Sequence, residues 1–406
     1  MKKIIKGTSQ LLISNLIAQS ISLVMMIIVC REYYLPNELE NFTLFQSAIS
    51  FFGVLFVFRL DSLFYIEKTN LNREILLKFC LGLIVLFSVL FFVFNLFLNI
   101  YNFNFKINLL LIFGIILMGF YTVSQTYLIN QDRISLAAIS RLAMPILNLL
   151  ITFILIKLNL KEIAMEMGLI GGMFLAIIIQ LIVIKFSSKF KASEGLNLVK
   201  HYRKDLFYGN FIYFINSFRD TLFILFISMF YQSKEYVASY SQGLRIVSLP
   251  ALVLSGAIGT VVGSYLKIEV DDRELLKRNY FKLLISIILI STVIYVLVFF
   301  FMDFAINLLF SKKWMYVSTC AKSLIPWLFV NFILNSLNGY FLILRFQLLN
   351  LVVNIFEVSF FILTFLLLGN TVKFEETLFY ASLWSLLFGT ILILILSIKI
   401  IKFAKK

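Results

Sequence analysis

Two arginines lie in the middle of long apolar stretches, where a charged side chain is costly. Arg219 falls within residues 207–231 and Arg245 within residues 237–264. The cost of a charge at the centre of a bilayer starts at about 2.5 kcal/mol. A guanidinium stays ionised away from water, and its planar fork matches the oxygens of a phosphate. The pattern therefore predicts a membrane-embedded site for an anionic group such as a phosphate or pyrophosphate.

Polar side chains on other apolar stretches extend this candidate site. At helical spacing they form stripes that cannot face lipid, and their amides and hydroxyls could bond to sugar hydroxyls. The alternative for such stripes is hydrogen bonding between neighbouring helices. The candidate binding residues are Arg219, Arg245, Arg59, Arg141, Asn15, Gln19 and Asn335.

Three acidic residues are candidates for coupling transport to an ion, namely Glu357, Asp220 and Asp61. Glu357 lies well inside an apolar stretch, where ionisable residues usually mark a pathway or a site. A purely structural alternative is an ion pair that neutralises Arg219, with either Glu357 or Asp220 as its partner. The charged residues nearer the ends of their stretches could instead extend to the membrane surface.

The composition is that of a polytopic membrane protein. Hydrophobic residues make up 61% of the chain, charged residues 14%, and the mean hydropathy is +0.97, which leaves too little polar surface for a soluble fold. The runs are too long and do not alternate as β-barrel strands would. We therefore expect an all-α protein with twelve transmembrane helices at residues 8–30, 41–63, 76–99, 107–129, 136–158, 163–186, 207–231, 237–264, 281–302, 318–343, 348–368 and 377–399.

The basic residues predict how these helices are oriented. Most of the 36 Lys and Arg residues fall on the side that holds both termini, so both termini should be cytoplasmic. The net charge of +15 is then a property of cytoplasmic loops, and no nucleic-acid partner is expected.

The hydrophilic segment 187–206 divides the chain into two parts of similar pattern. Arg133 is followed after 19 residues by Thr152-Phe153, and Arg345 is followed at the same spacing by Thr364-Phe365. We expect an N-terminal six-helix lobe at 1–186, a cytoplasmic linker at 187–206 and a C-terminal six-helix lobe at 207–406. Parallel repeats of this kind place a substrate site between the lobes near the membrane midplane.

Motifs for catalysis are absent from the sequence. It contains no G-x-x-x-x-G-K-[ST], H-E-x-x-H or G-x-S-x-G, and Cys30, Cys80 and Cys320 are too dispersed for a disulfide framework or a metal cluster. We expect a transporter rather than an enzyme, with no catalytic residue, no cofactor and no metal.

Four segments carry a resemblance to a known family. They are residues 6–47, FRLDSLFYIEKTN at 58–70, YSQGLRIVSLPALVLSGAIG at 240–259 and LFSKKW at 309–314. The chain resembles the Wzx-type polysaccharide flippases of the MATE/MOP superfamily over essentially its whole length. Ser311 stands where that family often has glycine. The resemblance implies a two-lobed helical bundle with a central cationic cavity that works by alternating access.

The resemblance also implies a substrate, namely undecaprenyl-pyrophosphate-linked repeat units of O-antigen, capsule, lipopolysaccharide or exopolysaccharide. The expected location is the bacterial inner membrane, and the expected form is a monomeric transporter beside a polysaccharide polymerase and chain-length machinery. One alternative is a cation-coupled multidrug exporter of the same superfamily, although its cavity should favour acids over arginines. Another is a membrane-embedded polysaccharide polymerase, which should have a long extracytoplasmic loop.

Overall fold

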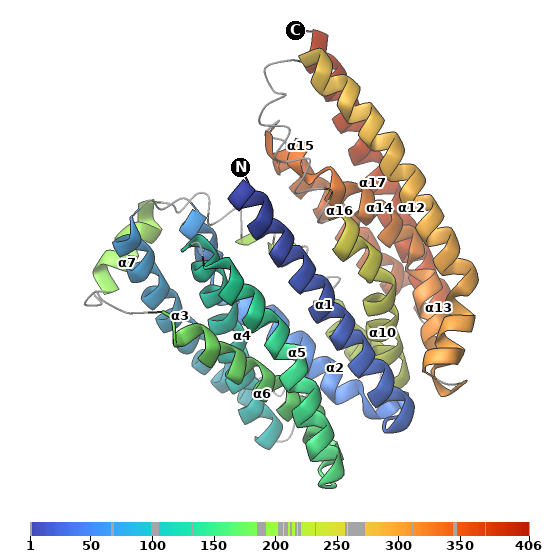
Figure 1. Ribbon diagram of the computed structural model, residues 1–406. Helices are drawn as coiled ribbons and strands as arrows, with labels where there is room; N and C mark the ends of the chain where they lie inside the picture. Colours follow the sequence, from blue (N-terminus) through green and yellow to red (C-terminus); the bar gives the residue numbers. More distant parts are fainter. Residues whose placement is uncertain are drawn as a thin grey trace. The chain divides into compact units, whose positions relative to one another are not determined.

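The computed structural model describes most of the chain, and every regular element in the described part is a helix (Figure 1). The described residues are 2–65, 69–98, 105–131, 133–184, 192–201, 206, 210–211, 213–215, 217, 221–231, 233–255, 258, 273–310, 312–343, 347–369 and 371–405.

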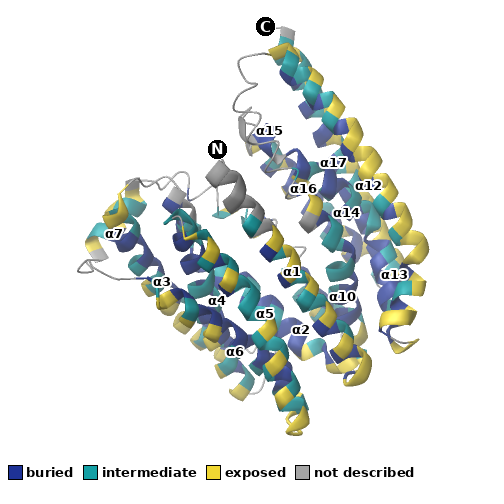
Figure 2. Ribbon diagram, viewed as in Figure 1, coloured by how far each residue is buried: buried dark blue, intermediate teal, exposed yellow. Residues whose placement is uncertain are grey.

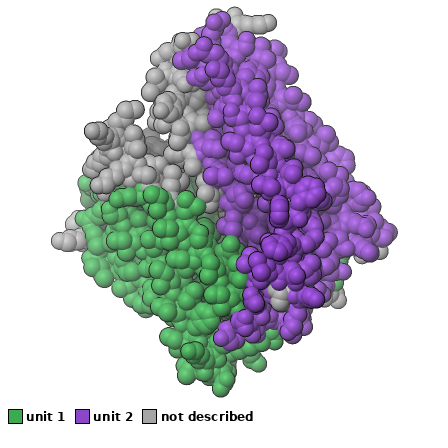
Figure 3. Space-filling model, turned by 45° about the vertical axis from the view of Figure 1, so that its right-hand side comes forward, with its two compact units in different colours: residues 1–29, 38–232 green, residues 30–37, 233–406 purple. Residues whose placement is uncertain are grey.

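The chain forms two compact units (Figure 3). Unit 1 comprises Met1–Val29 and Glu38–Gln232, and unit 2 comprises Cys30–Asn37 and Ser233–Lys406. Two lobes divided at the segment 187–206 stay a prediction.

In the described part of unit 1 there are eight longer helices. They are α1 (Lys2–Glu32, whose last three residues belong to unit 2), α2 (Glu40–Leu55), α3 (Asn70–Leu98), α4 (Phe105–Asn130), α5 (Ile134–Lys157), α6 (Lys161–Leu181), α7 (Ala192–His201) and α9 (Phe223–Tyr231). The short 3-10 helix η2 (Leu60–Tyr65) follows α2, and η1 (Pro36–Glu38) precedes it at the boundary between the units, with its first two residues in unit 2.

Unit 2 is built mainly from long helices. They are α10 (Lys234–Pro250), α12 (Arg273–Leu309), α13 (Met315–Ser323), α14 (Ile325–Ser336), α15 (Asn338–Ile343), α16 (Gln347–Leu368) and α17 (Phe374–Lys405), with the π-helical turn η4 (Ala251–Ser255) and the 3-10 turn η5 (Lys312–Trp314). The long helices α12 and α17 lie side by side in Figure 1 and contact each other.

Eight described helices are long and apolar enough to cross a membrane, or nine if the bent pair α13–α14 forms one span. The chain is therefore a multi-pass membrane protein of all-helical fold, while the count of twelve spans and the cytoplasmic termini stay predictions. The predicted span 318–343 is not one straight helix, because α13 and α14 meet at 54°. Pro326 explains the break, since its ring prevents a continuous helix through that turn.

Small residues bring the helices of unit 1 into close contact. Gly168 and Gly172 on α6 face Asn148 on α5, and Gly53 on α2 faces Met118 on α4. Such approaches are typical of membrane helices, where van der Waals packing replaces the hydrophobic effect between helices.

The outward faces of the helices are apolar. In unit 2, Phe300, Phe304 and Leu289 on α12 are exposed, and Figure 2 shows exposed residues along the length of that helix. In water such a surface would cause aggregation, whereas lipid solvates it. This arrangement identifies the exposed faces as lipid-facing and leaves the helix interfaces for polar chemistry.

Candidate functional site

A polar cluster joins α4, α5 and α6 in unit 1. The Arg141 guanidinium bonds to the Tyr121 hydroxyl. Gln125 Nε2 donates to Ser140 Oγ at 2.6 Å and lies 3.4 Å from the Tyr121 hydroxyl, while Gln180 Nε2 donates to Ser140 Oγ at 3.1 Å. Arg141 was predicted from its charge, but the other four residues were not. We call these five residues the Arg141 cluster.

Two buried amide oxygens of the Arg141 cluster accept no hydrogen bond from the residues that the structure describes. Gln180 and Gln125 are 0% and 5% exposed, and the Oε1 atom of each has no hydrogen-bond partner among the described residues. The Ser140 hydroxyl cannot supply a donor, because it already donates to the Ala137 carbonyl at 3.1 Å. An unsatisfied buried acceptor costs about 1–3 kcal/mol, so the cluster is suited to receive hydroxyl groups from water or a sugar.

Proline adds a further polar atom beside Arg141. Pro145 lies inside α5, four residues after Arg141. Because proline has no N–H, the carbonyl of Arg141 lacks its usual helical hydrogen bond. The Arg141 carbonyl is therefore a further acceptor on α5, the helix that carries the Arg141 guanidinium.

Arg59 lies in a strained turn between α2 and η2. Phe58 and Arg59 have φ values of 52° and 55°, a left-handed conformation that non-glycine residues seldom adopt. Asn210 Nδ2 donates to the Phe58 carbonyl at 3.0 Å and helps to hold the turn. Strain of this kind costs about 1–3 kcal/mol per residue and often marks functional positions.

Asp61 follows this turn in η2. It is partly buried and close enough to Cys80 on α3 to interact with it electrostatically. Phe58 and Leu60 pack in the same apolar cluster as Ala137, which lies one helical turn before Arg141. The Arg59–Asp61 turn and the Arg141 cluster thus border one core.

Glu166 on α6 is a buried acid that the sequence analysis missed. It is 3% exposed and, within the described part of the chain, its carboxylate meets no hydrogen-bonding group except its own backbone amide. Its face of α6 also carries Ile170, which approaches Gly114 on α4. An acidic residue within the apolar stretch 163–186 was the signal that could have identified it.

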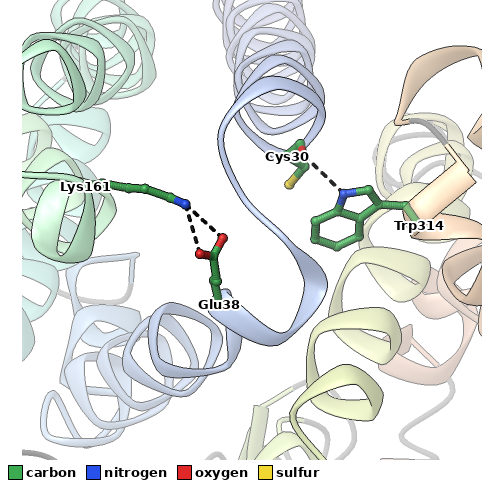
Figure 4. A network of polar contacts seen from close by, with 4 residues as sticks. All are labelled: Cys30, Glu38, Lys161 and Trp314. Atoms are coloured by element: carbon green, nitrogen blue, oxygen red, sulfur yellow. Dashed lines mark hydrogen bonds and ion pairs between the residues drawn. The ribbon is translucent and has the colours of Figure 1, made fainter. Parts of the chain in front are cut away.

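Arg245 is a charged residue on α10 in unit 2. It is partly buried on α10 and lies near Cys30 at the end of α1, with which it interacts electrostatically. The Cys30 carbonyl accepts a 3.1 Å hydrogen bond from Trp314 Nε1 (Figure 4). Both Cys30 and Trp314 are at most 1% exposed. The end of α1 is therefore fixed beside the arginine.

The other contact in Figure 4 belongs to unit 1. Lys161 Nζ, at the start of α6, lies 2.9 Å from both carboxylate oxygens of Glu38. Ser228 on α9 donates to Glu40 at 3.0 Å, close to the same chain segment. The segment that links α1 to α2 is thus held by polar contacts at each end.

Two further predicted residues lie in unit 2. Glu357 is buried on α16, whereas Asn335 on α14 is exposed. Asn354 Nδ2 donates to Asn350 Oδ1 at 3.1 Å on the same helix as Glu357, so part of that polar stripe is satisfied within α16.

The remaining predicted residues are less informative. Asn15 and Gln19 are partly buried on α1 in unit 1. Arg219 and Asp220 lie outside the described residues. The structure thus brings Arg141 together with a polar cluster and Arg245 with the end of α1, while one shared site for all the predicted residues stays a prediction.

The fold is that of the MOP superfamily. The lipid II flippase MurJ in an inward closed conformation matches with a TM-score of 0.74 at 14% identity, over 96% of this chain and 89% of that one. An inward-facing multidrug resistance MATE transporter matches with a TM-score of 0.67 at 12% identity, over 96% of both chains. A MOP transporter from Pyrococcus furiosus matches with a TM-score of 0.63 at 13% identity, over 99% of this chain and 96% of that one.

Sequence comparison identifies the family. No curated protein matches the chain. A family model described as "Polysaccharide biosynthesis protein" matches residues 66–319, a range that contains Arg141, Glu166 and Arg245. The solved proteins of similar fold are described as a flippase and a multidrug transporter. The chain belongs to this polysaccharide biosynthesis family and has the fold of the MOP superfamily.

Proposed function

We propose that the protein is a flippase that carries undecaprenyl-pyrophosphate-linked oligosaccharide repeat units across the bacterial inner membrane by alternating access. The observation that carries the proposal is the Arg141 cluster, in a chain of a polysaccharide biosynthesis family. A polysaccharide flippase needs groups that recognise both phosphate and sugar within the membrane. The cluster supplies a guanidinium for the first, and for the second two amide oxygens that have no hydrogen-bond partner in the described part of the chain.

The proposal assigns the other basic residues to the pyrophosphate. Arg245 on α10, together with Arg59 and Arg219, would bind phosphate oxygens, and Asn15, Gln19 and Asn335 would contact the sugars. The match to the lipid II flippase supports this assignment, because that protein has the same fold and, by its name, acts on a lipid-linked substrate. Glu357, Asp220, Asp61 and the additional acid Glu166 are the candidates for ion coupling.

Surface polysaccharide in a deletion strain tests the proposal. Without the protein, single lipid-linked repeat units should accumulate on the cytoplasmic leaflet. Replacing Arg141 or Arg245 with alanine should reproduce that accumulation, and lysine should rescue only partly because it lacks the planar fork. Normal surface polysaccharide in both alanine variants at equal protein levels would refute the phosphate assignment.

Matched control variants exist on the same helices. Lys157 is an exposed residue in the last turn of α5, the helix that carries Arg141. Lys234 is exposed at the start of α10, the helix that carries Arg245. Alanine at either lysine removes a charge from the same helix without touching the candidate site, and should leave polysaccharide export unchanged.

The second candidate function is a cation-coupled multidrug exporter of the same superfamily. The buried carboxyl of Glu166 favours it, since an acid without a basic partner among the described residues can exchange a proton for a cation. Drug susceptibility separates the two candidates. A deletion strain that becomes sensitive to cationic drugs while its surface polysaccharide stays normal would support the exporter.

A further inference from the structure

A cavity of about 280 Å³ opens at one end of unit 1, apart from the Arg141 cluster. It lies between the first turns of α3, the last turn of α4, the residue before α5 and the residues that follow α6. Arg133 at the cavity precedes Arg141 by eight residues on α5, a rise of about 12 Å. The cavity and the cluster are therefore two sites along the same helices.

The cavity has an apolar floor and a polar rim. Tyr127, Leu128 and Ile184 belong both to its lining and to the buried apolar core of unit 1. Arg133 and Gln131 line it from the turn between α4 and α5. Arg133 Nη1 donates to the Val183 carbonyl at 2.7 Å, which fixes the guanidinium across the gap between α5 and the end of α6.

The charges around the cavity favour an anion. Glu74 is the acid in its lining, and the Lys78 ammonium lies 2.9 Å from the Glu74 carboxylate. Arg73 Nη1 donates to the Asn130 carbonyl at 3.1 Å beside the cavity. Among the described residues in and beside the cavity, the basic residues Arg133, Arg73 and Lys78 outnumber the single acid Glu74.

We infer that this cavity binds the phosphodiester headgroup of an anionic phospholipid. It lies at the ends of membrane-spanning helices, on the side that the Lys and Arg distribution assigns to the cytoplasm, where lipid headgroups are concentrated. Basic pockets between transmembrane helices on this side suit anionic headgroups. At about 280 Å³ the cavity is slightly smaller than the roughly 300–1,000 Å³ of typical ligand pockets, a size that suits a headgroup alone and leaves the acyl chains in the bilayer.

The cavity goes beyond the proposed function, since neither the lipid nor its site takes part in transport of the repeat unit. Guanidinium and tyrosine hydroxyl donors suit phosphate oxygens, and the arginine held by Val183 loses little freedom on binding. Bound at four helix ends, the headgroup would hold α3, α4, α5 and α6 together.

Native mass spectrometry of the purified full chain tests the inference. The protein is reconstituted with phosphatidylcholine and increasing amounts of phosphatidylglycerol, and the lipid that remains bound is measured. We expect Arg133→Gln to weaken phosphatidylglycerol retention by about tenfold, or about 1.4 kcal/mol. Lys157→Gln, at the opposite end of the same helix, should leave retention unchanged.

Two further measurements keep the test decisive. Arg73→Gln should also weaken retention of phosphatidylglycerol. If Arg133→Gln does not fold, Arg73→Gln serves in its place, because it leaves the contact between Arg133 and the Val183 carbonyl intact. Glycerol 1-phosphate is the soluble probe: if it binds and phosphatidylglycerol does not, the lipid assignment is wrong. Equal retention by the wild type, Arg133→Gln and Arg73→Gln would also overturn it. No transport enters these readouts, so their failure is independent of the proposed function.

Discussion

Gly172→Ala is predicted to separate α5 from α6. A Cβ atom at Gly172 would lie 2.6 Å from the Met144 carbonyl oxygen and 3.0 Å from the Asn148 backbone nitrogen. Both atoms belong to the α5 backbone, so no side-chain rotation can relieve the contact. Overpacking of this kind costs about 1–3 kcal/mol. The Arg141 cluster would be disturbed as well, because it joins the same two helices.

Gly82→Ala provides the control for this prediction. Gly82 lies within α3, and a Cβ there would meet nothing within 4 Å. Alanine gains about 1 kcal/mol over glycine inside any helix, so Gly82→Ala should be stabilising. Both variants gain the same helix propensity, so the difference between their free energies of unfolding measures the steric clash at Gly172 alone.

The free energy of unfolding in detergent micelles, measured by denaturant titration, is the assay. The free energy of unfolding should be at least about 1 kcal/mol lower for Gly172→Ala than for Gly82→Ala. A difference toward the upper end of the overpacking range is expected, because the contacts are with backbone atoms. If the two variants are equally stable, α5 and α6 do not approach as closely as the structure shows and the reasoning fails.

Two other substitutions follow from the contacts described above. Glu166→Gln should keep or slightly raise the stability of the protein, because it removes a buried carboxyl that has no basic partner among the described residues. If Glu166 couples transport to protons, the variant should also lose the dependence of transport on a pH gradient, which a fluorescent pH indicator in proteoliposomes measures. An unchanged dependence would exclude Glu166 as the coupling residue. Trp314→Phe should lower the free energy of unfolding by about 1 kcal/mol, since it leaves the buried Cys30 carbonyl without its hydrogen-bond donor. Thermal unfolding measures this change, and an unaltered midpoint would show that water replaces the indole N–H.

Much of the fold is readable from the sequence, because a bilayer imposes long apolar helices. Each predicted span overlaps described helical residues, and the predicted ends of the span at 136–158 lie within two residues of α5. The bend at Pro326 was missed because hydropathy averages over a turn and does not register a change of direction.

The candidate site was only partly predictable. The charge of Arg141 and of Arg245 inside apolar stretches identified them, since lipid makes such residues expensive. Gln125, Ser140 and Gln180 escaped notice because they lie on three different helices and no spacing within one helix relates them. The left-handed turn at Phe58 and Arg59 carries no glycine to signal it.

The sequence by itself determined that the chain spans a membrane many times and that arginines occur within it, because both follow from the composition of single segments. Only the tertiary structure decided which polar groups meet. Helix packing assembled the Arg141 cluster, left two of its amide oxygens without a hydrogen-bond partner among the described residues and opened a cavity beside Arg133. These features depend on how separate helices approach each other, which no periodicity along one helix can specify.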